Sequence, residues 1–225
     1  MAEPHRVLVV DDDPATRAAY RAFLSRQPGV ELVAVARDGE EGVRAYAEAS
    51  PDVVLMDLEM PVVSGVEATR RITAAWPEAC VVVLTTFSTH ADVVSALRAG
   101  ASGYLLKDVG GAGLLNGIRQ ALAGDMPLSS AVRRALVGSV LREATPGDAP
   151  EAAAVTRRER ELLGWLAQGL TNQQIGAQMF LSEGSVKQYL SRIGDKLGVK
   201  SRTGILIRAV QVGLVEPHRL PPPRA

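Results

Sequence analysis

Five short apolar runs, rich in β-branched residues, constrain the fold of this chain more than any other feature. They occupy residues 6–10, 31–36, 52–56, 80–84 and 103–106. Continuous apolar runs of this length are typical of strands that are buried on both faces of a parallel sheet. Because helix-compatible stretches separate them, right-handed βαβ units are expected. We therefore predict an α/β domain over residues 4–124, a five-stranded, doubly wound parallel sheet with five helices.

Helix-capping signals in the C-terminal part of the sequence indicate a small all-α domain. Thr156-x-x-Glu159 and Thr171-x-x-Gln174 match the capping box, in which the N-cap and N3 side chains satisfy each other's backbone donors. Ser182 is a third candidate N-cap. The predicted helices span about 157–168, 172–179, 183–197 and 202–212. Two short helices joined by a tight turn outline a helix-turn-helix, so residues 155–216 are predicted to form a four-helix domain of this kind.

The remaining segments are predicted to be connections. Residues 144–154 mix Pro, Gly, Ala and acidic residues without periodicity, as linkers do. We assign residues 125–154 to a linker, in which residues 131–142 are also compatible with a short helix. The Pro-rich tail, residues 217–225, is predicted to be disordered.

Charge is distributed unevenly along a chain whose formal net charge is zero. Residues 155–225 hold 11 Lys or Arg against 5 Asp or Glu, so residues 1–154 carry the compensating excess of acid. A basic C-terminal part directs the search for a polyanionic partner to that part. The single cysteine, Cys80, fits a reducing compartment, and the chain shows neither a signal peptide nor a membrane-spanning run. We expect a soluble cytoplasmic protein without a membrane partner.

Chemistry-bearing side chains follow four of the five predicted strands. The carboxyl ends of parallel strands meet at one edge of a sheet, where ligands gather. The residues placed there are Asp11, Asp12, Asp57, Thr85 and Lys107. Three crowded carboxylates repel one another without a cation, and Mg²⁺ suits oxygen ligands. Asp57 is expected to accept a phosphoryl group, which Lys107 and Thr85 contact, whereas Asp13, before Pro14, is expected only to cap a helix.

The segments VLVVDDDP, DVVLMDLEMP, VVVLTTF and GYLLKD, in this order, resemble the receiver domain of response regulators over residues 5–123. The resemblance implies that Asp57 is the phosphoacceptor and that Asp11 and Asp12 bind the metal. It also implies a backbone carbonyl ligand at Glu59 and a switch aromatic at Tyr104. In the family, phosphorylation moves the hydroxyl matched by Thr85, and the aromatic side chain then rotates inward.

A polar surface on the third C-terminal helix is the candidate DNA-binding face. Val186, Leu190, Ile193 and Leu197 form its buried stripe. The opposite side carries donors that can reach bases or phosphates, namely Lys187, Gln188, Ser191 and Arg192. Further donors lie at helix starts and turns, where phosphate contacts are common: Thr171, Asn172, Ser182, Ser185, Lys200 and Arg202.

The motifs RERELL, GLTNQQI, LSEGSVK, KLGVKSRT and GLV resemble the LuxR-type (NarL/FixJ) DNA-binding domain over about 60 residues. The resemblance implies that the helix near 183–197 enters the major groove and that the helix near 202–212 forms a dimer contact, which suits inverted half-sites. The whole chain is thus identified as a member of the response regulators. We expect a transcription regulator that a sensor histidine kinase phosphorylates, that dimerises when phosphorylated and has no catalytic site. RNA polymerase is a further candidate partner.

Three other functions have weaker support in the sequence. Asp11-x-Asp13 imitates the nucleophile motif of haloacid-dehalogenase-like phosphatases, but Ala15 departs from it. The glycines at 110, 111 and 113 suggest nucleotide binding, yet Asn116 stands where a third motif glycine belongs. A ligand-sensing LuxR-type protein needs an N-terminal pocket, which 4% aromatic content and an acidic crevice do not favour.

Overall fold

The computed structural model describes residues 3–85, 90–128, 130–143, 152 and 154–215. The chain divides into two compact units, Met1–Ala123 and Gly124–Ala225. No helix within the described ranges is long and apolar enough to cross a membrane. The predicted tail over 217–225 lies outside the described residues, and so does most of the predicted linker stretch from 144 to 154.

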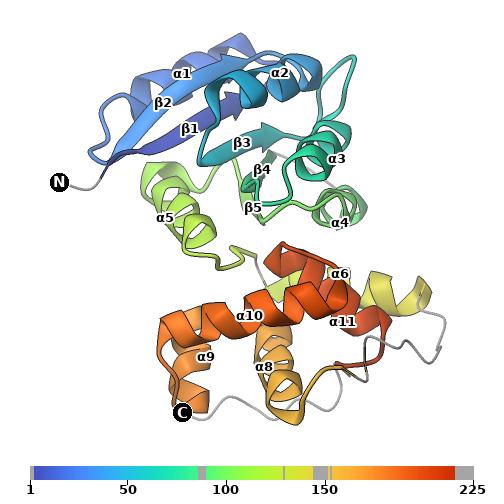
Figure 1. Ribbon diagram of the computed structural model, residues 1–225. Helices are drawn as coiled ribbons and strands as arrows, with labels where there is room; N and C mark the ends of the chain where they lie inside the picture. The colour runs from blue at the N-terminus through green and yellow to red at the C-terminus, as the bar shows by residue number, and fades with distance from the viewer. Residues whose placement is uncertain (1–2, 86–89, 129, 144–151, 153, 216–225) are drawn as a thin grey trace. The chain divides into compact units, whose positions relative to one another are not determined.

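The first unit is a five-stranded, all-parallel sheet, as the sequence predicts, and the structure gives its strand order as β2-β1-β3-β4-β5 (Figure 1). Its strands are β1 (His5–Val10), β2 (Val30–Ala36), β3 (Val53–Asp57), β4 (Val81–Thr85) and β5 (Gly103–Leu106). Its helices are α1 (Pro14–Leu24), α2 (Gly39–Ala49), α3 (Gly65–Ala75), α4 (His90–Arg98) and α5 (Gly110–Leu122). The order reverses beside β1 and β3, which places the switch point of the sheet at the strands that carry Asp11 and Asp57.

Alternate residues of each strand build two separate cores, one on each face of the sheet. Leu8 and Val10 pack with Ile72 of α3 in one core, to which α2 also contributes. Val9 packs with Ile118 of α5 in the other, which α1 completes. This two-sided burial explains why the strand sequences are almost continuously apolar. It also leaves only the strand ends for polar chemistry.

The loop between β3 and α3 is held tightly against the phosphoacceptor candidate. A Cβ on Gly65, the first residue of α3, would lie far inside contact distance of the Asp57 carbonyl, so only glycine fits there. In the same loop, Val62 has φ +67° and a side chain that is 90% exposed. A β-branched residue in this left-handed region is strained, and no burial of its side chain offsets the strain.

The second unit consists of α6 (Ser130–Glu143), α8 (Arg157–Gln168), α9 (Asn172–Met179), α10 (Glu183–Leu197) and α11 (Arg202–Gln211). Both predicted capping boxes are confirmed, at Thr156 and at Thr171. Gly169 ends α8 in the left-handed conformation, and Ser182 caps α10 through the Ser185 amide. Local capping chemistry thus sets the ends of the helix-turn-helix.

An ion pair fixes α10 to α8. Lys196 of α10 donates to both carboxylate oxygens of Glu159, at 2.8 and 2.7 Å, and Glu159 also completes the capping box of α8. The Glu159 side chain is 5% exposed. Burial raises the pKa of Glu159, but the hydrogen bonds from Lys196 and Thr156 outweigh this effect and hold the pKa below its ordinary value.

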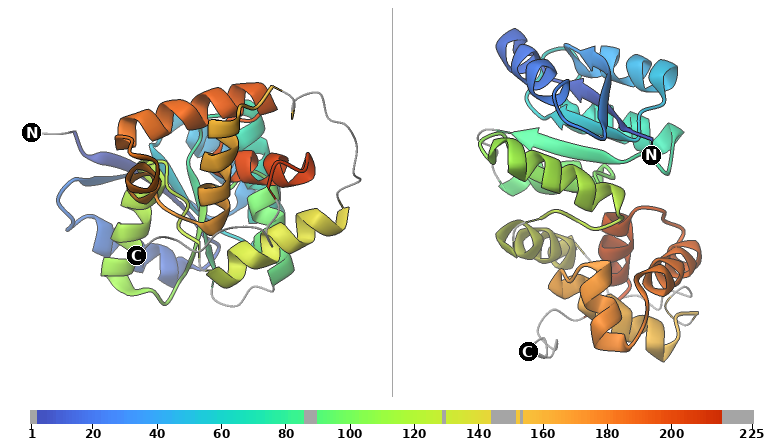
Figure 2. Two further views of the ribbon diagram at one scale, coloured as in Figure 1. Left: turned by 90° about the horizontal axis from the view of Figure 1, so that it is seen from below. Right: turned by 90° about the vertical axis from the view of Figure 1, so that its left-hand side faces the viewer.

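Much of the segment that we assigned to a linker is folded as part of the second unit. Helix α6 spans residues 130–143 and packs against α11 (Figure 2), and its Leu136 and Val140 side chains are buried. The sequence of α6 does not display a clear apolar stripe bounded by caps, so the sequence alone is compatible with either a linker or a short helix within 131–142. The second unit therefore begins at Gly124, directly after the first unit.

Two substitutions in the β3–α3 loop should act in opposite directions. Gly65→Ala should lower the free energy of unfolding of the first unit by about 3 kcal/mol, because the new methyl group meets backbone that cannot move away. Val62→Gly should raise it by about 1 kcal/mol by relieving the left-handed strain. Urea unfolding followed by Trp76 fluorescence in a Trp165→Phe background measures both; equal effects of the same sign would contradict this description of the loop.

Glu159→Gln should lower the free energy of unfolding of the second unit by about 2 kcal/mol at pH 7, because Lys196 loses its charged partner. Since the pKa of Glu159 is held below 4.5, its contribution is complete above pH 4.5 and disappears as the pH falls through the lowered pKa. The difference between wild type and variant should therefore shrink in acid. Unfolding followed by Trp165 fluorescence in a Trp76→Phe background measures this difference in free energy. Glu161→Gln, at an exposed position of α8, serves as control. A difference that grew on acidification would contradict this role.

Candidate functional site

Four of the predicted site residues meet at the carboxyl edge of the sheet. Asp11 follows β1, Asp57 ends β3, Thr85 ends β4 and Lys107 follows β5. Asp11, Asp57 and Thr85 are 1%, 6% and 1% exposed, so little solvent reaches these polar groups. Parallel pairing of β1, β3, β4 and β5 in this register brings their ends together. The edge is therefore a preformed polar site in an apolar sheet.

Lys107 forms the centre of this site. Its Nζ lies 2.7 Å from Asp11 Oδ2 and 3.0 Å from Asp57 Oδ2. Burial lowers the pKa of Lys107, but the two carboxylates outweigh burial and hold that pKa above its ordinary value. Burial raises the pKa of Asp57, and the Lys107 ammonium offsets this only in part. A second cation near Asp57 would favour its ionised form further.

Asp12 completes a set of oxygen donors at this edge. One carboxylate oxygen from each of Asp11, Asp12 and Asp57 can be chosen so that all lie within 4.8 Å of one another. Asp12 is exposed, so the cluster opens to solvent on one side. Hard oxygen ligands that are partly open to water match Mg²⁺, which keeps several waters in its coordination sphere. The donor set therefore fits this ion.

The structure separates Asp13 from the cluster, as the sequence predicts. Its carboxylate accepts hydrogen bonds from the Ala15 and Thr16 amides at the start of α1. These hydrogen bonds, with that of the Thr16 hydroxyl, lower the pKa of Asp13. Both carboxylate oxygens are engaged in capping, so Asp13 is a structural residue.

Glu59 and Tyr104, the other two residues assigned by the resemblance to receivers, lie close in sequence to Asp57 and Lys107, respectively. Glu59 lies in the loop two residues beyond Asp57, and its side chain is exposed. Tyr104 pairs with Val83 in the register of β5 and β4 and is half-buried. Tyr104 thus stands three residues before Lys107 on the edge strand of the sheet.

Two residues of α1 that the sequence reasoning missed also face this site. The Arg17 guanidinium donates to the Asp11 carbonyl oxygen at 2.7 Å. Tyr20 lies within electrostatic range of Lys107, Asp11 and Asp57, and burial raises the pKa of its phenol. The Asp13 cap gives the available sequence signal, because it marks the start of α1, and Arg17 lies one turn later, where its backbone N–H donates to the Asp13 carbonyl.

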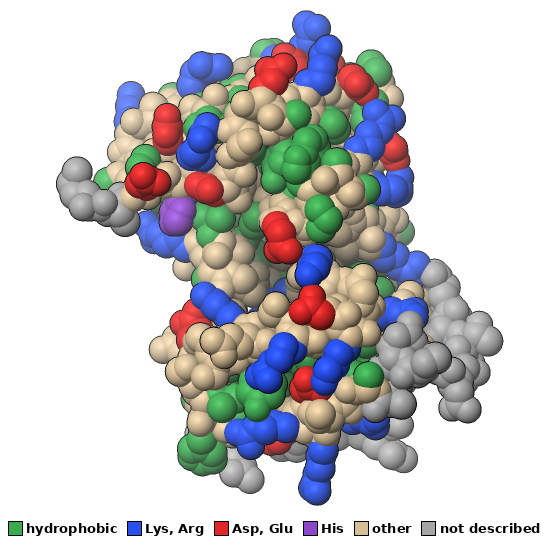
Figure 3. Space-filling view, viewed as in Figure 1, with side chains coloured by type: hydrophobic (Ala, Val, Ile, Leu, Met, Phe, Trp, Pro, Cys, Tyr) green, Lys and Arg blue, Asp and Glu red, His purple; other side chains and the backbone are tan. Residues whose placement is uncertain are grey.

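The second unit exposes the polar face predicted for its third helix. Val186, Leu190, Ile193 and Leu197 of α10 are buried, which confirms the predicted stripe. Lys187, Gln188, Ser191 and Arg192 are exposed. In Figure 3, Lys and Arg side chains gather on the face of this unit along which α10 runs. The face therefore carries donors suitable for an anionic partner.

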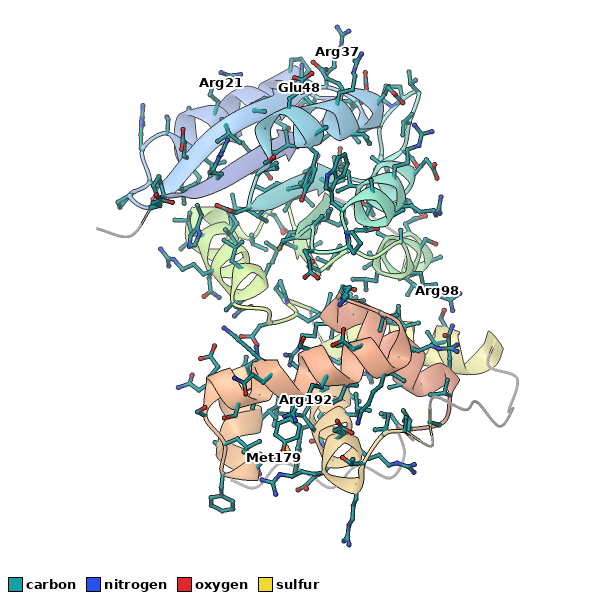
Figure 4. All side chains as sticks on the ribbon, in the orientation of Figure 1. Arg21, Arg37, Glu48, Arg98, Met179 and Arg192 are labelled. Carbon is teal, nitrogen blue, oxygen red and sulfur yellow. The ribbon has the colours of Figure 1, made fainter. Side chains whose placement is uncertain are left out.

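Weak local contacts on and just beyond α10 engage the cations of this face. Lys187 Nζ lies 3.0 Å from Glu183 Oε1, one turn earlier. The Arg192 guanidinium stacks over the Tyr189 ring at 4.5 Å from its centroid; Figure 4 labels Arg192 on α10. Lys200 Nζ lies 2.8 Å from Asp195 Oδ1. These surface pairs are weak and open readily when a polyanion competes.

The donors predicted at helix starts fall into two groups. Thr171, Ser182 and Ser185 take part in helix caps; Ser182 remains exposed and Ser185 is half-buried. Asn172 is 1% exposed and the Arg202 side chain 8% exposed, which differs from the expectation that both face DNA. Their side chains are hydrogen bonded to each other. Periodicity could not reveal this, because the two residues are 30 positions apart.

Comparison with known proteins agrees with this arrangement. The family model of the response regulator receiver domain matches residues 7–119. The model of bacterial regulatory proteins of the luxR family matches residues 153–209. The two matches correspond to the sheet that carries the acidic edge and to the helices from α8 to α11.

Several regulators are similar along nearly the whole chain. The transcriptional regulatory protein LiaR of Bacillus subtilis is 39% identical over 93% of this chain and 99% of its own. The nitrate/nitrite response regulator NarL of Escherichia coli is 35% identical over 89% and 92%. The crystal structure of ChrA, a response regulator of a heme-sensing two-component system, covers 95% of this chain and 100% of its own at 36% identity, with a TM-score of 0.51. The chain therefore belongs to the two-component response regulators with a LuxR-type DNA-binding domain, which are transcriptional regulators.

Proposed function

We propose that Asp57 accepts a phosphoryl group from a sensor histidine kinase and that this modification controls DNA binding by α10. The observation that carries the proposal is the position of Lys107 Nζ, 3.0 Å from Asp57 Oδ2 and 2.7 Å from Asp11 Oδ2. A nucleophilic carboxylate, a second carboxylate and an ammonium at one buried strand edge supply the groups that phosphoryl transfer to an acid requires. The acyl phosphate forms as the bond from the donor's nitrogen to phosphorus breaks.

Asp11, Asp12, Asp57 and the Glu59 carbonyl are the groups that would hold Mg²⁺. When bound, the ion would neutralise charge on the acceptor and on the phosphoryl oxygens. Lys107 then pairs with one phosphoryl oxygen in place of the Asp57 carboxylate oxygen that it contacts in this structure. Arg17 orients the Asp11 carbonyl from outside the site. The apolar surroundings of Asp57 limit access of water to the product.

Thr85 and Tyr104 are the proposed switch. The added phosphoryl group carries close to two negative charges and offers new acceptor oxygens. Thr85, buried at the end of β4, donates its hydroxyl to one of them. Tyr104, half-buried on β5 beside β4, turns into the space that Thr85 leaves. The surface of α4, β5 and α5 thereby changes its packing, which is the bistable element that the charge biases.

The DNA partner is proposed to be a duplex with inverted half-sites, bound by a phosphorylated homodimer. Helix α10 enters the major groove, where Lys187, Gln188 and Ser191 read base edges and Arg192 contacts the backbone. Helix α11 is the proposed dimer contact, through the side that does not pack on α6, α8 and α10. RNA polymerase is a further partner that we propose for the bound dimer.

Asp57→Asn should abolish phosphoryl incorporation from acetyl phosphate and Mg²⁺, because the amide has no anionic oxygen to attack phosphorus. Intact-mass spectrometry measures the gain of one phosphoryl group. Glu59→Gln is the matched control and should incorporate normally, since only the Glu59 backbone is assigned a role. Phosphate trapped on Asp11 instead of Asp57 would support the phosphatase-like alternative and contradict the receiver assignment.

Lys187→Ala should weaken binding to DNA selected from genomic fragments by about tenfold or more, the usual cost of losing a base contact. Fluorescence anisotropy with phosphorylated full-length protein measures the affinity. The control is Arg134→Ala, which removes an exposed cation from α6 and should change the affinity by less than about threefold. Equal losses in both variants would mean that α10 contributes only charge.

A further inference from the structure

The segment that enters the second unit places a carboxylate at the start of the helix-turn-helix. Asp125 Oδ1 accepts a hydrogen bond from the Asn172 amide, the first residue of α9, at 2.8 Å. The Arg202 guanidinium lies 3.8 Å from the same oxygen. The side chains of Arg202 and Asp125 are 8% and 16% exposed, so this contact is largely shielded from water.

Arg202 binds several groups of this segment and of α9 at once. Its guanidinium donates to the Gly124 carbonyl at 3.3 Å, to the Leu170 carbonyl at 2.6 Å and to the Asn172 side chain. Burial lowers the pKa of Arg202 to about 10, which leaves the group charged at neutral pH. Its buried Nε–H has no hydrogen-bond partner among the residues that the structure describes. One donor of the guanidinium therefore remains for another acceptor.

The residues just beyond Asp125 also contact the helices of the second unit. Met126 is buried and accepts the Thr203 hydroxyl at its sulfur, at 3.3 Å. Arg133 of α6 donates to the Leu128 carbonyl at 3.2 Å and to the Gln168 carbonyl at the end of α8, at 2.7 Å. The guanidinium groups of Arg202 and Arg133 thus dock residues 124–128 onto the turn between α8 and α9. Asp125 is the acidic side chain of this docked stretch.

The groups around Asp125 form a typical phosphate-binding set. A helix N-terminus offers backbone N–H donors and a partial positive charge, and a guanidinium supplies full charge and planar donors. In helix-turn-helix proteins the first helix of the motif crosses the DNA backbone, and helix N-termini are frequent phosphate donors. In this chain that helix is α9. Its first amide and Arg202 are engaged by an internal carboxylate instead.

We propose that Asp125 occupies the position of a DNA backbone phosphate and that its release from α9 is a step in DNA binding. The inference rests on the proposed DNA binding by the second unit. It assigns Asn172 and Arg202 to DNA contact only after Asp125 has left, which accounts for their burial in this structure. Asp125 is three residues beyond the end of α5, so a shift of that helix acts on the contact through a very short stretch of chain.

The test uses unphosphorylated full-length protein and a random-sequence 30-base-pair duplex, followed by fluorescence anisotropy over a range of salt concentrations. Asp125→Asn keeps an oxygen for the Asn172 amide but removes the charge that excludes phosphate; Asp125→Ala removes both. Each should bind about five- to tenfold more tightly, the effect of one charge-assisted contact. The slope of log affinity against log salt should steepen by about 0.9, as for one added phosphate.

The matched control is Glu161→Gln, which removes the same charge from an exposed position on α8. It should leave the salt slope unchanged. Wild-type affinity and slope in both Asp125 variants, with wild type binding the duplex, would overturn the inference while leaving the proposed function intact. An absence of binding by every protein, phosphorylated or not, would overturn both. If Asp125→Ala unfolds the second unit, Trp165 fluorescence will detect it. The affinity and salt slope of Asp125→Asn then test the inference alone.

Discussion

The ammonium of Lys107 between Asp11 and Asp57 is the interaction on which the chemistry of the first unit depends. The parallel sheet buries both of its faces, so its polar groups are confined to the strand ends, and three carboxylates gather there. Burial raises the pKa of Asp57 and so favours the protonated form of this proposed nucleophile. The half-buried Lys107 ammonium contacts two of the three carboxylates and opposes this effect at Asp57, and the exposed Asp12 leaves the cluster open to solvent on one side. A change of charge at Asp57 therefore acts directly on the ammonium that also contacts Asp11.

In the second unit, two basic side chains likewise join one helix to another. Lys196 joins α10 to the capping box of α8, and Arg202 joins α11 to the start of α9. Ion pairs of this kind add little net stability because desolvation offsets their attraction, but breaking one leaves a costly unpaired charge. They therefore specify arrangement more than they stabilise it. In both units, a basic side chain on one element sets the position of an acidic or polar group on another.

The sequence predicted the elements of the fold and the acidic edge well, for reasons that are local. The apolar runs and the helix caps at Thr156, Thr171 and Ser182 depend on residues within a few positions of one another. The acidic edge follows because parallel strands all end at the same edge of the sheet. For residues 130–143 a linker and a short helix were both compatible with the sequence, and the burial of Asn172 and Arg202 and the contact of Arg17 with Asp11 were not predicted. Each depends on partners distant in sequence or on the rotation of a helix about its axis. The pair of Asp125 and Arg202, 77 residues apart, carries no periodic signal at all.

The packing of α6 on α11 determines where a receiver could be replaced by recombination without disrupting the second unit. The luxR family match begins at residue 153, yet the described second unit has its N-terminal boundary at Gly124. A recombination that joined a foreign receiver at the family boundary would leave the apolar surface beneath α6 uncovered and Arg202 without Gly124 and Asp125. A junction at residue 123 or 124 would carry the whole folded unit along. The folded second unit is therefore longer than the stretch that the luxR family model matches.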